Sequence, residues 1–118
     1  MRILRVATTA VAMVALWLAI GVCFASAAAV VKTIKVGSGP FGVSSDGTHV
    51  WVTNYGGAEN GDTLSEIDAS TGKVVKTIKV GRGALGVSSD GTHVWVTDTD
   101  GGTVSEIDAS TGTVVNTI

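Results

Sequence analysis

The stretch GVSSDGTHVWVT occurs twice in this chain, at residues 42–53 and again at residues 86–97. In each copy, two runs of apolar and β-branched residues flank an Asp-Gly pair, which is the strongest short-range signal of a β-hairpin. Because the whole stretch returns, we expect the chain to repeat one unit of structure.

Further segments return in the same order. VVKTIKVG at residues 30–37 recurs at residues 74–81, and VVNTI at residues 114–118 begins a third copy. SEIDASTG at residues 65–72 recurs at residues 105–112. A repeat length of about 40–45 residues is typical of β-propeller blades.

The first unit contains four strand-like runs separated by turn residues, at residues 41–45, 49–53, 63–68 and 73–80. These runs are rich in Val, Ile and Thr, and their apolar residues lack helical spacing. We therefore predict an all-β fold of β-propeller blades, with two four-stranded antiparallel blades at about residues 38–80 and 82–118. A lone N-terminal outer strand at residues 30–36 is expected to precede them.

The runs VWVTN at residues 50–54 and VWVTD at residues 94–98, followed by TLSEID and TVSEID, resemble the YVTN-type β-propeller repeat. That family has a tyrosine where Trp51 and Trp95 stand here. The resemblance covers both units and implies binding outside the cytoplasm or at a cell surface, with the partners unspecified.

The sequence departs from the family pattern at Glu66 and Glu106, where the family usually has an apolar residue. From this charge we expect the third strand of each blade to be less tightly covered. The WD40 family fits worse, because neither its GH nor its WD dipeptide occurs in register.

A closed propeller requires about 4–8 blades, and this chain supplies two. We therefore interpret the chain as the N-terminal piece of a longer propeller, or as a protomer that self-associates to complete a ring. Two blades alone would leave apolar sheet faces uncovered.

Residues 1–27 are predicted to be a signal peptide. Arg2 and Arg5 form a basic start, residues 6–24 are uncharged and mostly apolar, and Ala25-Ser26-Ala27 fits a cleavage site. Cleavage after Ala27 predicts a secreted, periplasmic or cell-surface protein of residues 28–118. The alternative is an uncleaved membrane anchor, because the apolar run is just long enough to span a bilayer.

The formal net charge of −2 and the lack of a basic run argue against nucleic acid as a partner. The single cysteine, Cys23, lies inside the predicted signal peptide, so disulfides and thiol chemistry are excluded from the mature domain. The expected partner is an unknown protein or surface ligand.

The differences between the two near-identical units cluster in two links. Ser38 becomes Arg82 in the link between the fourth and first strands, and residues 54–62 become 98–102 in the link between the second and third. In a propeller both links lie on one face, which we interpret as a ligand-binding face on a constant scaffold. The alternative is that these loops vary freely because they carry no fold. The candidate ligand-binding residues are Tyr55, Glu59, Asn60, Asp62, Arg82, Asp98 and Asp100.

Other polar residues have simpler interpretations. Asn54, Glu59, Asn60 and Asp62 could offer oxygen ligands to a hard cation, but a solvated polar loop is the preferred interpretation. The repeated His49 and His93 favour a structural role over metal binding or proton transfer, and we predict neither a metal site nor a cofactor. Asp68 and Asp108 are expected to accept backbone hydrogen bonds in turns. Trp51 and Trp95 are expected to pack between neighbouring blades.

No catalytic motif is present. The leading hypothesis is an exported, non-catalytic binding or scaffold module. The alternatives are the N-terminal part of a propeller enzyme, similar to lactonases, streptogramin lyases or quinoprotein dehydrogenases, and a truncated product without function.

Overall fold

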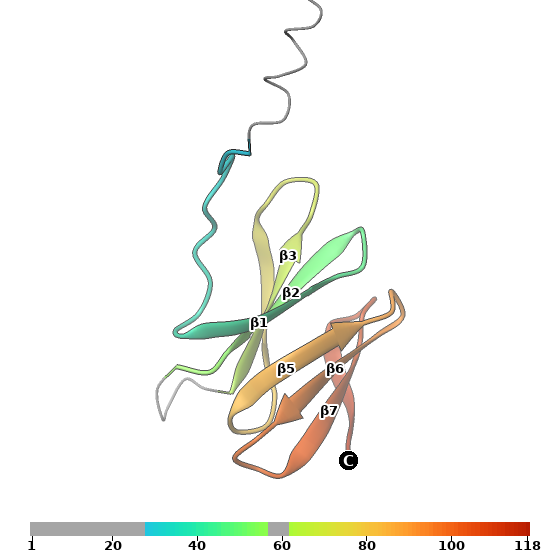
Figure 1. The fold of residues 1–118 in the computed structure, drawn as a ribbon. Helices are drawn as coiled ribbons and strands as arrows, with labels where there is room; N and C mark the ends of the chain where they lie inside the picture. Colours follow the sequence, from blue (N-terminus) through green and yellow to red (C-terminus); the bar gives the residue numbers. More distant parts are fainter. Residues whose placement is uncertain (1–27, 57–61) are drawn as a thin grey trace, which may run out of the picture. The chain divides into compact units, whose positions relative to one another are not determined.

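The computed structural model describes residues 28–56 and 62–118, and the regular structure in this part of the chain is entirely β. Two four-stranded antiparallel sheets follow each other, each with its strands in chain order (Figure 1). The first, blade 1, contains β1 (Pro40–Ser45), β2 (His49–Asn54), β3 (Thr63–Asp68) and β4 (Val74–Lys79). The second, blade 2, contains β5 (Ala84–Ser89), β6 (His93–Asp98), β7 (Thr103–Asp108) and β8 (Thr113–Thr117). The predicted pair of four-stranded antiparallel blades is confirmed.

The hairpin turn between the first two strands forms at the Asp-Gly pair, as predicted. The Asp46 carboxylate accepts hydrogen bonds from the backbone N–H groups of Thr48 at 2.9 Å and His49 at 2.8 Å. Gly47 has a φ of 95°, a conformation that is strained for residues with a Cβ atom. The second Asp-Gly pair repeats this turn, with Gly91 at a φ of 91°.

The turn between the third and fourth strands is also held by an aspartate. Asp68 Oδ1 accepts hydrogen bonds from the N–H groups of Ser70 at 2.8 Å and Thr71 at 3.1 Å. Asp108 makes the same contacts in blade 2, to Ser110 and Thr111. The predicted turn role of both aspartates is confirmed, and these hydrogen bonds lower the pKa of each carboxyl, the bond from the serine hydroxyl being the largest cause.

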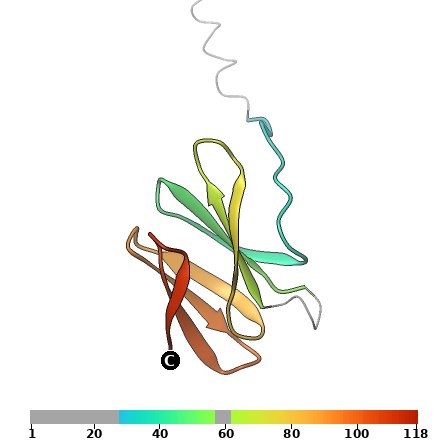
Figure 2. The same cartoon turned by 180° about the vertical axis from the view of Figure 1, so that it is seen from behind.

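One core lies between the two blades. Blade 1 contributes Trp51, Leu64, Ile78 and Val80, and blade 2 contributes Ala84, Val94, Val96, Ile107 and Ala109. The β5 strand lies beside β1 and β2 in the views of Figure 1 and Figure 2. The predicted packing between blades is therefore confirmed for Trp51, whose side chain is fully buried. For Trp95 the prediction is wrong within the described residues: its side chain is 36% exposed, because no further sheet covers that face of blade 2.

The segment before β1 is not a strand, in contrast to the predicted lone outer strand at residues 30–36. A β-strand requires a hydrogen-bonded neighbouring strand, and within the described residues no strand pairs with this segment. Lys32 Nζ instead donates to the backbone oxygen of Thr71 at 2.8 Å. Residues 32–118 form one compact unit.

The predicted signal peptide, residues 1–27, lies outside the described residues. Among the residues that are described, no helix is long and apolar enough to cross a membrane.

Candidate binding face

The two variable links of each blade are hydrogen-bonded to each other. In blade 1 the N–H of Tyr55 donates to the backbone oxygen of Gly39 at 2.8 Å. In blade 2 the N–H of Asp100 donates to the backbone oxygen of Arg82 at 3.0 Å. The predicted juxtaposition of the links is therefore confirmed within each blade. We call these segments, residues 37–40 and 54–56 with Asp62 in blade 1, and 81–83 and 98–102 in blade 2, the loop face.

Three of the candidate residues present their side chains to solvent. Tyr55 is 40% exposed, and Arg82 and Asp100 are also exposed. A phenol, a guanidinium and a carboxylate combine apolar contact area with hydrogen-bond donors and acceptors, and Tyr and Arg are enriched where proteins bind one another. Of the candidate residues that the structure describes, these three are the ones most available to a ligand.

Asp62 forms an ion pair with Lys79, whose Nζ lies 2.7 Å from Asp62 Oδ2. The backbone oxygen of Asp62 also accepts a hydrogen bond from the N–H of Val80 at 2.8 Å. Lys79 belongs to the run of residues 73–80, which was predicted only as the fourth strand of the first unit. Its position at the end of β4, just before the link that carries Arg82, is the signal that would have placed it on the loop face.

Asp98 is only 1% exposed, and its carboxylate is occupied by internal hydrogen bonds. It accepts from the hydroxyls of Ser105 at 2.7 Å and Thr103 at 3.1 Å, and from the N–H of Gly81 at 3.1 Å. These bonds fasten the end of β6 to β7 and to the link between the blades. We therefore assign Asp98 to the support of the loop face and not to ligand contact.

Asn54 occupies the corresponding position in blade 1 and is also buried. Its amide nitrogen donates to Thr63 Oγ1 and Ser65 Oγ, both at 3.0 Å. Among the described residues, no partner reaches Asn54 Oδ1. Glu59 and Asn60, which were predicted beside it, lie outside the described residues.

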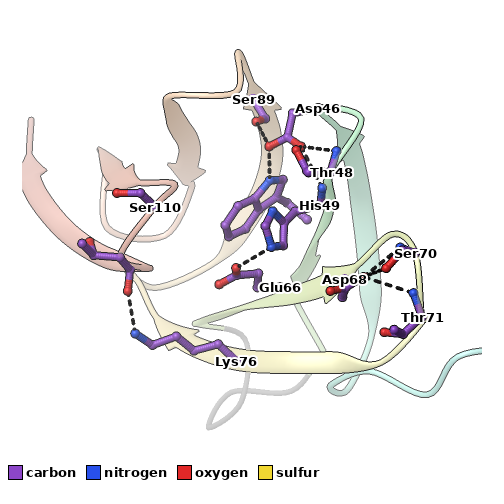
Figure 3. Close-up of polar contacts among 12 residues, drawn as sticks. Asp46, Thr48, His49, Glu66, Asp68, Ser70, Thr71, Lys76, Ser89 and Ser110 are labelled. Carbon is purple, nitrogen blue, oxygen red and sulfur yellow. Dashed lines mark hydrogen bonds and ion pairs between the residues drawn. The ribbon is translucent and has the colours of Figure 1, made fainter.

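Within the described part of the chain, no cluster of three or more His, Cys, Asp or Glu side chains is arranged to hold a metal ion. The two histidines pair with glutamates instead. His49 Nε2 lies 3.4 Å from Glu66 Oε2 (Figure 3). His93 Nε2 lies 3.5 Å from Glu106 Oε2. This repeated contact matches the structural role predicted for the histidines.

The pairing of His49 with Glu66 also explains how a charged residue is buried in the third strand of blade 1. Glu66 is only 8% exposed, so the expectation of a loosely covered strand is wrong at this position. The buried carboxylate is accommodated because His49 from β2 lies directly beside it.

Among the described carboxyl groups, that of Asp46 has the most strongly shifted pKa. Burial acts to raise the pKa of Asp46, but hydrogen bonds from the N–H groups of His49 and Thr48 and from the side chains of Trp51 and Ser89 outweigh it. The pKa therefore lies well below its ordinary value. Figure 3 shows the carboxylate between Ser89 on one side and Thr48 and His49 on the other. This group joins the two blades and lies away from the loop face.

Comparison with known proteins gives the fold. No family model matches the chain, and no curated protein matches it. Hydrazine synthase from Kuenenia stuttgartiensis, a β-propeller-containing protein, matches with a TM-score of 0.61 and 21% sequence identity. The match covers 76% of this chain and 26% of that chain, so the present chain spans about a quarter of the length of the protein it resembles. At this identity the similarity shows the fold alone: the chain consists of β-propeller-like blades.

Proposed function

We propose that this chain is a non-catalytic binding module, exported from the cytoplasm, that uses its loop face to bind a protein or surface ligand. One observation carries the proposal. Most of the positions that differ between the units gather in hydrogen-bonded links that expose Tyr55, Arg82 and Asp100, while the Asp-Gly and Ala-Ser-Thr-Gly residues of the turns at the other end of each blade are the same in both units. Variable loops on a constant scaffold are the usual arrangement of a binding site.

Export and membership of the YVTN-type repeat family belong to the same proposal. The apolar segment of residues 6–24 and the Ala25-Ser26-Ala27 sequence support export. The repeated VWVTN and VWVTD runs support the family. The alternative of a propeller enzyme with its active site in further blades gains nothing from hydrazine synthase, because 21% identity carries the fold and no activity.

The test compares two double variants. Labelled protein is applied to intact cells of the strain that produces it, and bound protein is measured by titration. Tyr55→Ala with Arg82→Ala should weaken binding about tenfold, the loss expected when one aromatic or Arg anchor of an interface is removed. Lys73→Ala with Thr92→Ala, at the opposite end of the blades, is the matched control and should bind as the wild type does. Equal binding by both double variants, with unchanged circular dichroism, would contradict the proposal.

A further inference from the structure

The contact between the blades contains a small set of directional bonds. Ser89 Oγ of blade 2 donates to Asp46 Oδ2 of blade 1 at 3.2 Å, and this oxygen is also held within blade 1 by Trp51 Nε1, which donates to it at 3.2 Å. Thr53 Oγ1 donates to the backbone oxygen of Leu85 at 2.7 Å. Blade 2 is therefore positioned on blade 1 by specific polar contacts as well as by apolar packing.

Blade 2 carries the same groups on its own far face. Asp90, Trp95 and Thr97 correspond to Asp46, Trp51 and Thr53, yet within the described residues they make none of these inter-blade bonds. Trp95 is 36% exposed, whereas its counterpart is fully buried. Blade 2 thus carries an indole, a carboxylate and a hydroxyl at the positions that correspond to those where blade 1 receives its neighbour.

Blade 1 carries the complementary surface. On β5 the side chain of Val87 packs against the core and the backbone oxygen of Leu85 accepts a hydrogen bond from blade 1. Their counterparts on β1 are Val43 and Phe41. Phe41 is 68% exposed and Val43 is 67% exposed, which is unusual for two large apolar residues close together on one strand. Ser45 repeats Ser89, the serine that donates to Asp46.

We propose that blade 1 of a second copy of this chain docks on the exposed face of blade 2 and repeats the contact that joins blade 1 to blade 2. In the docked pair Ser45 of the second copy donates to Asp90, and Thr97 donates to the backbone oxygen of its Phe41. The interface is head-to-tail, so successive copies continue the arrangement until a ring closes. A ring of about 4–8 blades requires roughly two to four copies.

The segment before β1 decides how the copies fit together. Lys32 Nζ donates to the backbone oxygen of Thr71 at 2.8 Å. In the same way Lys76 Nζ, labelled in Figure 3, donates to the backbone oxygen of Thr111 at 2.9 Å. Residues 32–37 therefore lie against blade 1 as the fourth strand of a preceding blade would. In the docked pair this place is next to β7, where β8 already lies. One of the two similar sequences, VVKTI or VVNTI, forms the fourth strand, and the other is displaced.

The choice of variants for the test rests on the different space around Gly42 and Gly86. A Cβ atom at Gly42 would lie 2.6 Å from the backbone oxygen of Leu85, because blade 2 is docked there. At Gly86 the same atom would meet only Thr97, with Oγ1 at 3.0 Å. Gly86→Ala should therefore fold and obstruct docking on blade 2, and Trp95→Ala is a second variant on that face. Val43→Glu places a charge on the docking surface of blade 1.

The experiment measures the mass of the full chain by sedimentation, with circular dichroism to confirm that each variant is folded. The wild type should associate in a concentration-dependent manner, and each single variant should be monomeric. An equimolar mixture of Gly86→Ala with Val43→Glu should form a dimer, because each variant keeps the surface that the other has lost. Association through the apolar segment of residues 6–24 would be equal in all the variants.

A monomeric wild type would overturn the proposal and leave a following blade of a longer protein as the occupant of this face. Equal association of the wild type and both variants would also overturn it. A mixture that stays monomeric would exclude the head-to-tail contact.

Discussion

The β2 and β6 strands share the sequence HVWVT but are buried on opposite faces. In β2 the indole of Trp51 is fully buried, whereas Trp95 in β6 is 36% exposed. In β6 Val94 and Val96 are fully buried, whereas their counterparts in β2 are only half-buried. Each blade is covered on the side of its neighbour, so one sequence has two environments.

This comparison teaches that the shared strand sequence is suited to burial on both faces. The tryptophan side and the valine side are each buried in one of the two blades. A strand buried on both faces is typical of a blade with neighbours on both sides. The uncovered side of each blade is the face to which the docking proposal assigns another blade.

Removing the indole should give the largest difference in stability between the corresponding variants of the two blades. In dilute solution, Trp51→Ala should lower the free energy of unfolding by about 3–5 kcal/mol, because a fully buried aromatic side chain is lost from the core. Trp95→Ala should cost about 1 kcal/mol or less. Urea unfolding followed by circular dichroism measures both values, and equal losses would contradict the observed difference in burial.

Protein concentration sharpens this first comparison. If a second copy covers Trp95, the cost of Trp95→Ala should rise with protein concentration, because association stabilises the folded wild type. The cost of Trp51→Ala relative to Trp95→Ala should then fall. A gap between the two variants that is independent of concentration would count against docking at this face.

The aspartate of the hairpin turn should give the next largest difference. Asp46→Asn should destabilise the fold by about 1–3 kcal/mol, because an amide NH₂ group would face the indole N–H of Trp51 in a partly buried place. Asp90→Asn should cost less, since among the described residues the Asp90 carboxylate accepts hydrogen bonds only from the turn N–H groups of Thr92 and His93. Thermal and urea unfolding of the two variants at neutral pH tests the order.

The pH dependence of stability tests the hydrogen bonds of Asp46 independently. The folded pKa of Asp46 lies below the ordinary value of about 3.9, so the ionised carboxylate stabilises the fold above about pH 4. This contribution is lost as the pH falls further toward the folded pKa. The stability of Asp46→Asn should therefore depend less on pH between about pH 4 and pH 2 than that of the wild type. Parallel curves for the two proteins would contradict the assigned hydrogen bonds.

The lysine contacts should have the smallest effect. Lys76→Met and Lys32→Met each remove one exposed hydrogen bond to a turn carbonyl, and both should change the free energy of unfolding by less than about 0.5 kcal/mol. A loss well above this from Lys32→Met alone would show that the segment before β1 contributes more than its exposed position indicates.

Much of the fold was predictable from short stretches of sequence. The Asp-Gly pairs determine the hairpin turns because aspartate caps the backbone and Gly47 adopts a positive φ. The β-branched runs of the first unit predict β1 to β4 to within one residue at their ends, and the repeat predicts that the same four strands return in blade 2. The segment at residues 30–36 shows the limit of such reasoning, because a strand sequence forms a strand only beside a partner.

The candidate site was predictable only in part. The differences between the units located the links, and hydrogen bonds join these links within each blade. Chemical type alone did not separate Asp98, which is buried and bonded to Ser105, from Asp100, which is exposed. The ion pair of Asp62 with Lys79 was equally invisible, because it depends on where β4 ends relative to a link.

The sequence by itself determined the repeat, the strands, the turns and the pairing of neighbouring strands, since these depend on residues close together in the chain. Only the tertiary structure decided which of two identical tryptophans is buried and which is exposed. The physical reason is that burial depends on the neighbouring sheet: β5 and its blade cover Trp51, and within the described residues no sheet covers Trp95.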